Sequence, residues 1–372
     1  MSKIKVMTVF GTRPEAIKMA PLVKELEKYP EIFENIVCVT AQHRQMLDQV
    51  LDIFQIKPDF DLNIMKHNQN LWSLTSEVLL GIKDVLEKAK PDIVLVHGDT
   101  TTSMAAALSA FYAKIPVGHV EAGLRTFEKY YPFPEEINRV FADAVCSYHF
   151  APTDKSVENL VKSQISTEHI YKTGNTVIDA LFYTLKNNRA DLRGIKLDDS
   201  LKTILLTSHR RENFGEPIKN ICKAVLKLVE QNKNIQVVYP VHPNPNIKDV
   251  VYSILGNKER IKLIEPLEYT DFCALMEKAH IILTDSGGVQ EEAPSLGKPV
   301  LVLRTTTECP EAIEYGTVKL VGTDTDKIVN ETQKLLDSEE EYKKMSEAIN
   351  PYGDGKACGR IVEVLKKIKP CE

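Results

Sequence analysis

Short apolar segments rich in Val, Ile and Leu recur along the whole chain, and segments with helical periodicity lie between them. Near-continuous runs of this kind indicate strands covered on both faces, which is typical of parallel sheets flanked by helices. We therefore expect an α/β protein with two doubly wound, Rossmann-like domains that face a central cleft. The expected strands are residues 4–10, 35–41, 92–98, 116–122, 147–153, 203–209, 235–241, 261–266, 280–285, 299–303 and 318–322.

The length of 372 residues suits two domains, and a charged stretch at 186–202 favours a junction close to it. We expect one domain over residues 1–175 and a second over 176–350. The remaining segment, 351–372, has a helical pattern after a Gly-rich turn. In doubly wound sheets, ligands bind outside the carboxyl ends of the strands, so both sets of strand ends should border one cleft.

The composition excludes several classes of function. A net charge of −5 gives no general attraction to nucleic acid, and no apolar run approaches the roughly 20 residues that span a bilayer. Nine histidines occur without an H-x-x-x-H spacing, so we expect no metal site. The chain has no G-x-G-x-x-G after a strand and no P-loop, so we expect no cofactor. Seven scattered cysteines and the lack of a leader predict a cytoplasmic location.

The loop after the expected strand at 280–285 has the composition of an anion site. Ser286, Gly287 and Gly288 would let backbone N–H groups approach a phosphate at the start of a helix. Glu292, about one and a half helical turns further on, suits two vicinal ribose hydroxyls. A plain helix cap with an acidic first turn is the alternative. Together these residues favour a nucleotide ligand.

Cationic side chains follow expected strands in both halves of the chain. Arg13 and Lys18 come from the first half, and His209, Arg210 and Arg211 from the second. This set suits a pyrophosphate, because Arg offers bidentate contacts and Lys a point charge. The alternative for each residue alone is a solvated surface position or, for the histidine, a satisfied strand end.

Three carboxylates of the first half are candidates for proton transfer. Asp99 and Glu121 each follow an apolar strand, and Glu135 opens a helix behind Pro134. Proton transfer at carbon needs a positioned base, and a partner on the other face of the reacting carbon. Helix capping by Asp99, or pairing of Glu135 with Arg139, is the structural alternative.

Long motifs in these loops resemble those of the non-hydrolysing UDP-N-acetylglucosamine 2-epimerases. The resemblance extends from residue 4 to about residue 365 and is carried by VFGTRPEAIKMAPL, VLVHGDTTT, PVGHVEAGLRT, YPFPEEINR, HRREN and DSGGVQEEAPSLGKPVLVLR. It implies a fold like that of the two-domain GT-B glycosyltransferases, a homodimer, and a terminal helix that packs back on the first domain. It also implies interconversion of UDP-GlcNAc and UDP-ManNAc by anti elimination of UDP to 2-acetamidoglucal and re-addition, which supplies ManNAc for surface polysaccharides.

The resemblance also implies roles for individual residues. The acid and base groups correspond to Asp99, Glu121 and Glu135. The groups that bind or stabilise the phosphates correspond to Arg13, Lys18 and the catalytic His209. Contacts to diphosphate, ribose and uracil correspond to Ser286, Gly287, Gly288, Glu292 and Phe272.

Two departures from the family pattern affect the nucleotide site and a second site. Cys309 stands where an Arg is expected, although Arg304 is close in sequence. Bacterial members bind a second UDP-GlcNAc as an activator, and the segment His67-Asn68-Gln69 replaces an Arg associated with that site. The matching positions for the activator are Gln42, Gln45, Glu136, Arg210 and His242.

Two other classes of function remain open at the level of the residues. A GT-B-type UDP-sugar glycosyltransferase would share the nucleotide cleft, but it needs one base and an acceptor pocket rather than three carboxylates. A non-catalytic sensor of sugar nucleotides would not need the three carboxylates. A hydrolysing relative usually carries a fused sugar kinase, for which this chain has no room.

Overall fold

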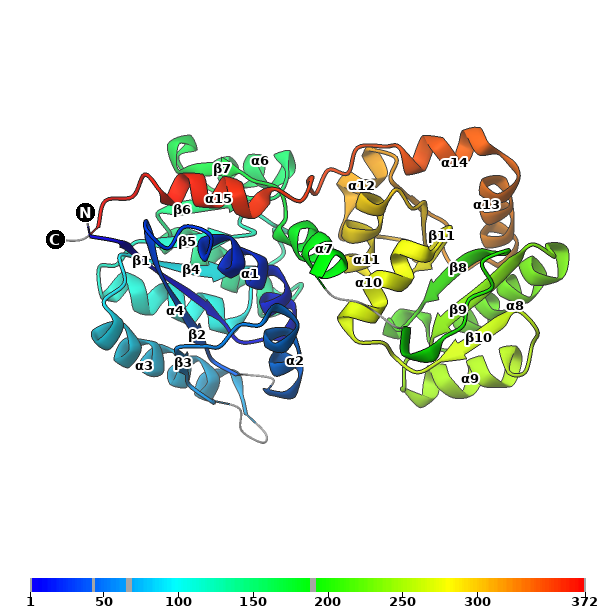
Figure 1. Cartoon of the computed structure of the whole chain (residues 1–372), viewed down its shortest axis with the longest axis horizontal. Coiled ribbons are helices and arrows are strands. Elements are labelled where there is room, and N and C mark those ends of the chain that lie inside the picture. Colours follow the sequence, from blue (N-terminus) through cyan, green and yellow to red (C-terminus); the bar gives the residue numbers. More distant parts are fainter. Residues whose placement is uncertain (1, 42–43, 65–68, 188–191, 371–372) are drawn as a thin grey trace. The chain divides into compact units, whose positions relative to one another are not determined.

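The computed structural model describes residues 2–41, 44–64, 69–187 and 192–370. The chain divides into two compact units (Figure 1). Unit 1 comprises Met1–Thr184 together with Tyr352–Glu372, and unit 2 comprises Leu185–Pro351. The end of the chain therefore belongs to the same unit as its beginning.

The sheet of unit 1 has seven strands, all parallel, in the order β3-β2-β1-β4-β5-β6-β7. The strand order reverses between β1 and β4, and this is the point where ligands bind in doubly wound sheets. The strands are β1 (Ile4–Phe10), β2 (Phe33–Val39), β3 (Phe60–Asp61), β4 (Ile93–His97), β5 (Val117–Val120), β6 (Tyr148–Ala151) and β7 (Ile170–Lys172).

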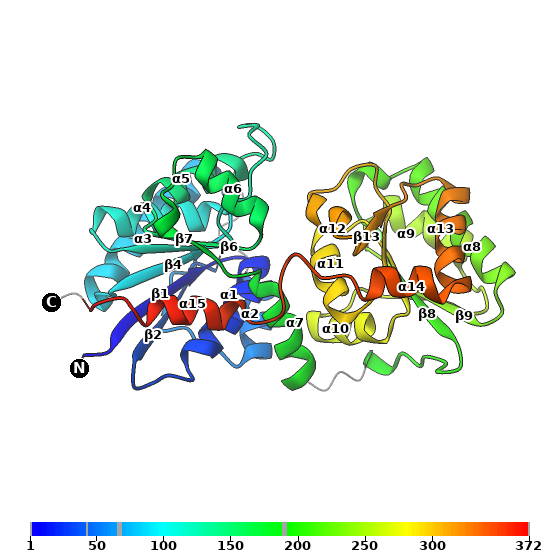
Figure 2. The same ribbon diagram turned by 90° about the horizontal axis from the view of Figure 1, so that it is seen from above.

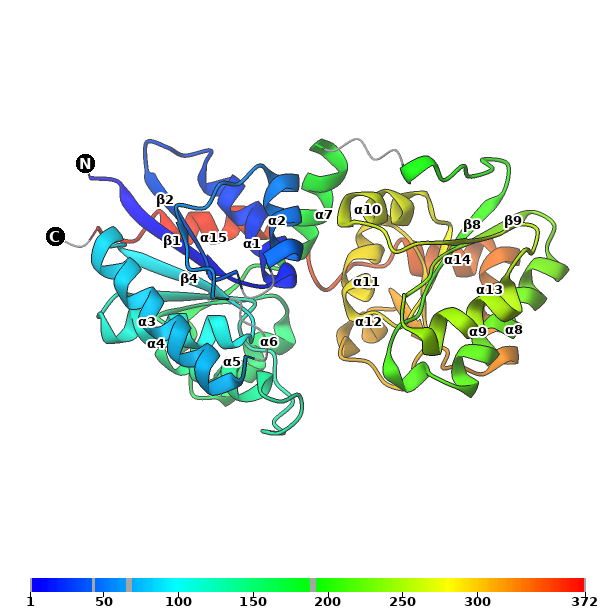
Figure 3. The same cartoon turned by 90° about the horizontal axis from the view of Figure 1, so that it is seen from below.

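Alternation along β1 explains how the unit 1 sheet buries both faces. Val6 and Phe10 point into a core shared with α1, α2 and α15, whereas Met7 and Val9 point into a core shared with α3 and α4. Figure 3 shows these two groups of helices on opposite sides of the sheet. The helices are α1 (Arg13–Leu26), α2 (Arg44–Phe54), α3 (Leu71–Ala89), α4 (Thr101–Tyr112), α5 (Glu135–Val145), α6 (Asp154–Lys162), α7 (Thr176–Asn187) and α15 (Ala357–Leu365).

The terminal helix α15 lies along α1 (Figures 1 and 2). Its residues Ile361 and Leu365 belong to the same buried cluster as Leu22 and Leu26 of α1. A carboxylate of α7 caps its start, because Asp179 accepts hydrogen bonds from the first two amides of α15 at 3.1 and 2.9 Å. The expected domain boundary at residue 175 directly precedes α7, and the structure keeps this helix in unit 1 as far as Thr184.

The sheet of unit 2 has six parallel strands in the order β10-β9-β8-β11-β12-β13, with the reversal between β8 and β11. Its strands are β8 (Lys202–Thr207), β9 (Ile235–Pro240), β10 (Ile261–Ile264), β11 (Ile281–Thr284), β12 (Val300–Val302) and β13 (Val318–Leu320). Its helices are α8 (Glu216–Gln231), α9 (Pro245–Leu255), α10 (Tyr269–Lys278), α11 (Gly287–Glu292), α12 (Pro310–Glu314), α13 (Thr325–Asp337) and α14 (Glu339–Ser346).

Two parallel α/β units confirm the expected fold class, and each of the eleven expected strands overlaps an observed one. Strands β3 and β7 were not predicted, because they are two and three residues long and lack a continuous apolar run. In the part of the chain that the structure describes, we find no helix with the length and apolar character needed to cross a bilayer.

Candidate active site

The expected functional side chains lie in two groups at the carboxyl ends of strands, either in the loops there or in the helices that directly follow those loops. The amino-terminal half-site contains Arg13, Lys18, Asp99, Glu121 and Glu135 of unit 1. The carboxy-terminal half-site contains His209, Arg210, Phe272, Ser286, Gly287, Gly288 and Glu292 of unit 2. Within each unit, these loops flank the reversal in strand order, where doubly wound sheets bind ligands.

Glu121 is the most enclosed carboxylate of the amino-terminal half-site, with 9% of its side chain exposed. Its Oε2 forms an ion pair with Lys18 of α1 and accepts a 2.8 Å hydrogen bond from Nδ2 of Asn175. The Nε2 atom of buried His97 lies 3.6 Å from the same oxygen. Two elements that were expected separately, α1 and the loop after β5, thus meet at one carboxylate.

The surroundings of Glu121 favour its ionised form. Burial alone would raise the pKa of its carboxyl group, but the positive charges of Lys18 and His97 outweigh burial and lower the pKa below its usual range. The backbone of Glu121 has a φ of 62°, a left-handed conformation that is uncommon for a residue with a side chain. Such strain is concentrated at functional sites, where the surrounding structure enforces it.

Asp99 pairs with Arg139 of α5 rather than serving as a helix cap. Nδ2 of Asn138 also donates to the backbone oxygen of Asp99 at 3.0 Å, so α5 holds this loop through two neighbouring residues. The cap of α4 is Thr100, whose hydroxyl accepts from the amide of Ser103 at 3.1 Å. The Asp99 side chain keeps 28% of its surface exposed. The alternative hypothesis that Asp99 caps the helix is therefore wrong.

Glu135 opens α5, and its buried Oε2 has no hydrogen-bond partner among the described residues. Arg139 binds Glu136 and Asp99 instead, with 3.2 Å between its guanidinium and Glu136 Oε2. A buried polar atom without a partner is rare in a native structure and marks a place where a ligand can contribute a hydrogen bond. Glu135 Oε2 is thus an unsatisfied carboxylate oxygen in the amino-terminal half-site.

Buried Glu15 joins the segments on both sides of the strand reversal of unit 1, although no sequence pattern marks it as a functional residue. Its Oε2 accepts from the amides of Gly11 and Thr12 at 3.0 and 2.7 Å, and its Oε1 accepts from the hydroxyls of Thr100 and Ser103 at 2.5 and 2.9 Å. The amides belong to the loop after β1, and the hydroxyls belong to the cap and the first turn of α4, which follows β4. Glu15 therefore holds in place the two backbone segments next to Arg13 and Asp99.

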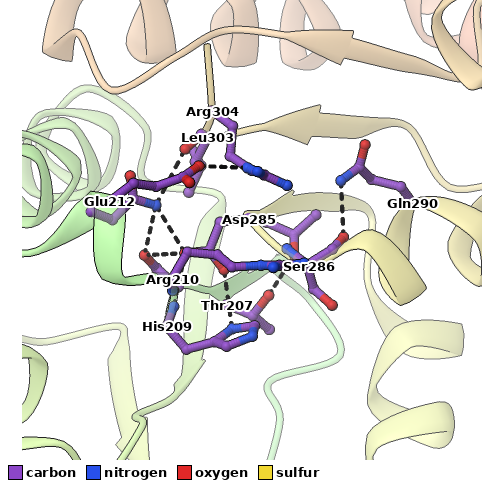
Figure 4. A network of polar contacts seen from close by, with 12 residues as sticks. Thr207, His209, Arg210, Glu212, Asp285, Ser286, Gln290, Leu303 and Arg304 are labelled. Carbon is purple, nitrogen blue, oxygen red and sulfur yellow. Dashed lines mark hydrogen bonds and ion pairs between the residues drawn. The ribbon is translucent and has the colours of Figure 1, made fainter. Parts of the chain in front are cut away.

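The carboxy-terminal half-site is built around Asp285, which directly follows β11 and is fully buried (Figure 4). Its carboxylate binds the neighbouring loop after β8, which carries His209 and Arg210. The rings of His209 and His242 stack with their centroids 6.0 Å apart. Burial and the charge of His209 both lower the pKa of His242.

An ion-pair ladder borders the glycine turn of unit 2. Arg304, which is almost fully buried, binds Glu212 and Glu308 at 2.6 Å each, and Glu308 also lies 3.4 Å from Arg210. A β-carbon added at Gly287 would lie 3.6 Å from Glu308 and 3.9 Å from Arg210. Glycine at this position thus leaves the charged groups accessible next to the backbone of the turn.

Cys309 is buried beside this ladder, and its sulfur lies 3.8 Å from the backbone oxygen of Gly287. Arg304, the neighbouring cation, is engaged by two carboxylates of unit 2.

Glu292 is buried at the end of α11 and accepts a 2.6 Å hydrogen bond from the hydroxyl of Tyr269. Burial, and then the charge of Glu292, raise the pKa of Tyr269 well above its usual value, so the phenol stays a donor. A β-carbon at Gly288 would lie 3.8 Å from Glu292. Phe272 is half-buried on α10, three residues after Tyr269 and therefore on the same side of the helix.

The expected activator residues are spread over both units. Gln42 lies outside the described residues, as does Asn68, and Gln45 belongs to α2. Glu136 is buried and accepts from the amides of Thr126 and Phe127 at 3.0 and 2.9 Å, so its carboxylate positions the loop after β5. No group of three His, Cys, Asp or Glu side chains that could hold a metal ion occurs among the residues with described positions.

Comparison with known proteins connects this arrangement to a family. The family model of UDP-N-acetylglucosamine 2-epimerase matches residues 24–366. A UDP-N-acetylglucosamine 2-epimerase of Bacillus subtilis (strain 168) is 58% identical over 365 residues, which are 98% of this chain and 96% of the relative.

Solved structures agree with the sequence comparison. A UDP-GlcNAc 2-epimerase from Neisseria meningitidis bound to UDP-GlcNAc shares 52% identity and a TM-score of 0.86, over 98% of this chain and 100% of that chain. The enzyme from Methanocaldococcus jannaschii in complex with UDP-GlcNAc and UDP shares 36% identity and a TM-score of 0.77, over 97% of this chain and 99% of that chain. These matches confirm the resemblance of the motifs, and the chain belongs to the UDP-N-acetylglucosamine 2-epimerase family of isomerases.

Proposed function

We propose that this chain interconverts UDP-GlcNAc and UDP-ManNAc by anti elimination of UDP, through 2-acetamidoglucal, and re-addition of UDP. The observation that carries the proposal is the grouping of Asp99, Glu121 and Glu135 at one end of the unit 1 sheet, in a chain of this family. Simple deprotonation at C2 would not suffice, because the C2 proton of an N-acetylhexosamine is weakly acidic.

The chemistry balances without a cofactor. As the C1–O bond breaks, its electron pair leaves with UDP, and the C2–H pair becomes the C1=C2 double bond. Re-addition of UDP with protonation of C2 from the opposite face gives the epimer. The reaction therefore needs two proton carriers, stabilisation of positive charge at C1, and a strong hold on the departing diphosphate.

The three carboxylates differ in their surroundings, and we assign them different tasks. Lys18 and His97 keep Glu121 ionised, which suits stabilisation of positive charge at C1. Glu135 has a buried oxygen open to a ligand, and Asp99 is paired but partly exposed, so these two are the proton carriers. Inversion at C2 requires one proton carrier on each face of that carbon.

The carboxy-terminal half-site supplies most of the groups that we assign to the nucleotide. We assign the diphosphate to Arg13, Lys18, His209 and the Ser286–Gly288 turn, the ribose to Glu292, and the uracil to Phe272. The half-exposed cations of the loop after β8 and the backbone amides of the glycine turn support this assignment. Retention of UDP by these groups would allow it to add back to the glycal.

The direct test is incubation of the protein with UDP-GlcNAc in heavy water, followed by proton NMR. The proposal predicts deuterium at C2, UDP-ManNAc as the minor species, and little free UDP. Unchanged substrate or net hydrolysis would overturn it. A GT-B-type glycosyltransferase, the alternative function, would leave UDP-GlcNAc unconverted in the absence of an acceptor.

We also propose that the chain forms a homodimer through α3, α4 and α5 of unit 1. Helix α4 packs against both α3 and α5. Large apolar side chains are exposed along the three helices, namely Trp72, Leu80, Phe111, Tyr112 and Phe141. Trp72 alone is 82% exposed, and a cavity of 660 Å³ lined by Leu80 and Tyr112 opens on the same helices. Apolar patches of this kind mark protein interfaces.

Light scattering after gel filtration tests the dimer. The parent chain should have twice the mass of 41.9 kDa that the sequence gives, and Leu80→Glu should shift it to the monomer mass. A parent that elutes as a monomer at micromolar concentration would rule out the proposed dimer.

Activation by a second UDP-GlcNAc is a separate proposal, supported by the positions of Arg210 and His242 beside His209. Gln42, Gln45 and Glu136 complete the proposed activator set. Hyperbolic kinetics with UDP-ManNAc alone, at full rate and without added UDP-GlcNAc, would contradict it.

We further propose that the enzyme works in the cytoplasm and supplies ManNAc for surface polysaccharides. Six described cysteines are free, and five of them are buried. Thiol titration of the denatured protein, purified without reductant, should count seven free thiols. Deletion of the gene should remove ManNAc from the surface glycans of the source cell.

A further inference from the structure

The Asp285 carboxylate makes more contacts than a strand-end acid needs for its own loop. Its Oδ2 accepts from the hydroxyl of Ser208 at 3.0 Å, from the amides of His209 and Arg210 at 2.8 and 2.9 Å, and from Nδ2 of Asn213 at 2.8 Å. All four donors belong to the loop after β8, the neighbouring strand across the reversal (Figure 4). One buried oxygen thus accepts hydrogen bonds along the whole 208–213 loop.

The second oxygen of Asp285 faces the His209 ring. Oδ1 lies 3.1 Å from His209 Nδ1, within ion-pair distance, and it has no hydrogen-bond partner within the described residues, so the ring is the nearest group that could donate to it. An anionic acceptor at this distance favours a proton on Nδ1, because that nitrogen then donates toward the negative charge. Nε2 is then the acceptor in the neutral ring and a second donor in the charged ring.

The carboxylate is well suited to stay ionised in this position. Burial raises the pKa of Asp285, but the hydrogen bonds from His209 and from the amides of the loop outweigh burial and lower it. An ionised oxygen accepts several donors at once, whereas an amide side chain offers one acceptor oxygen and would direct N–H groups at other donors. The groups that face the His209 ring are Asp285 and His242, so Asp285 supplies the negative charge.

We propose that Asp285 is a positioning residue of the reaction, which holds His209 with Nδ1 protonated and Nε2 directed to the substrate diphosphate. The inference rests on the proposed function of His209 as the group that stabilises the departing UDP. Asp285 itself does not touch the substrate, and it acts only through the ring and the loop that it holds. No group is transferred to or from Asp285 in the reaction.

The first experiment compares steady-state kinetics of the parent, Asp285→Asn, His209→Asn and the double variant, with UDP-GlcNAc as substrate. We expect Asp285→Asn to lower kcat by roughly 10- to 100-fold, the effect of losing the outer partner of a functional histidine. KM should change by less than about threefold, because the loss falls on the transition state. In the His209→Asn background, the same change should lower kcat by less than about threefold.

A matched control separates positioning from simple loss of structure. Tyr239→Phe removes a 3.2 Å hydrogen bond from a buried hydroxyl to the backbone oxygen of Ser208, in the same loop, without touching Asp285. We expect this variant to keep the parental kcat. Equal and additive losses of kcat in Asp285→Asn and Tyr239→Phe would overturn the inference, because they would show that any weakening of the loop suffices.

A second measurement observes the ring of His209 in the parent and does not depend on turnover. Long-range proton–nitrogen NMR of the parent, labelled with nitrogen-15 in its nine histidines, identifies which ring nitrogen of neutral His209 is protonated. The signal is assigned by its absence from His209→Asn. Protonation at Nδ1 supports the inference, and protonation at Nε2 overturns it. Failure of the epimerase proposal itself would appear separately, as a parent enzyme that does not convert UDP-GlcNAc.

Discussion

The two half-sites use the same sheet topology for opposite electrostatic purposes. In unit 1, carboxylates lie at the strand ends, and the cations Lys18 and Arg139 are bound to them. In unit 2, the strand-end carboxylate Asp285 is buried beneath backbone amides, and the cations His209 and Arg210 keep 41% and 38% of their side chains exposed. Under the proposed function, the first arrangement suits proton transfer and charge stabilisation, and the second suits the binding of an anion.

The position of the charged side chains, rather than their presence, distinguishes the two half-sites. Both reversals in strand order carry acids and bases, and in unit 2 the acid at the end of a strand lies behind the loop that it organises. Glu15 of unit 1 plays the corresponding part there, since its buried carboxylate binds loop amides and hydroxyls. A doubly wound sheet can thus present either sign of charge, depending on which side chain is buried in the fold.

The largest effect should come from removal of a proton carrier in unit 1. We predict that Glu135→Gln lowers kcat by about 10²- to 10⁴-fold, because an amide cannot take or return the C2 proton. Proton NMR in heavy water measures both turnover and exchange at C2. The matched control is Asp154→Asn, which loses a surface ion pair with Lys172 in the same unit and should keep the parental rate. Undiminished C2 exchange in Glu135→Gln would remove Glu135 from this role.

Loss of the exposed His209 side chain in unit 2 should come next. We predict that His209→Asn lowers kcat by about 10²- to 10³-fold, the loss expected when one stabilising donor to a departing oxygen is removed. Its binding of UDP, measured by calorimetry, should weaken far less than its rate. A variant that loses binding and rate in the same proportion would show that His209 only holds the ground state.

A smaller effect should follow from a change in the nucleotide contacts of unit 2. We predict that Glu292→Gln raises KM for UDP-GlcNAc by roughly tenfold, because a charge-assisted hydrogen bond to the ribose is lost. Tyr269→Phe is the matched control, since it removes the 2.6 Å partner of Glu292 and leaves the carboxylate. Steady-state kinetics should show the larger rise for Glu292→Gln, and the reverse order would contradict the ribose assignment.

The smallest expected effect concerns stability against acid. The folded structure lowers the pKa of Glu121, so its contribution to the free energy of unfolding is complete above the ordinary value of 4.5 and is lost as the pH falls below it. One such group adds at most about 1.4 kcal/mol per pH unit to the slope. The free energy of unfolding can be measured with urea at a series of pH values from 6 downwards. It should fall less steeply with falling pH for Glu121→Gln than for the parent, and an identical dependence on pH would contradict the lowered pKa.

Sequence patterns predicted the fold well because its strands are buried on both faces. The run at residues 4–10 is continuous and apolar, and it became β1 with the expected bounds. Strands β3 and β7 gave no such signal, because pairing with a neighbouring strand, rather than burial, stabilises them. The parallel order also explains why loops distant in sequence could be expected at one edge of each sheet.

The partners of the site residues were much harder to predict. Nothing local distinguishes Glu15 from other acids in the first turn of a helix, and its four donors come from two segments about 90 residues apart in the sequence. Asn175 and Arg139 likewise reach their carboxylates across 54 and 40 residues. One sequence signal could have found such partners, namely a polar residue that ends an apolar strand next to a Gly-rich or His-rich loop. Asp285 is an example.

Positional isotope exchange directly tests whether the C1–O bond is cleaved and re-formed. UDP-GlcNAc labelled with oxygen-18 in the bridge between C1 and the β-phosphorus would be incubated with the enzyme and followed by phosphorus NMR. The label should move into non-bridging positions of the β-phosphate as UDP-ManNAc forms, because the β-phosphate of the cleaved but retained UDP rotates before UDP adds back. Epimerisation with the label still wholly in the bridge would contradict the proposed mechanism.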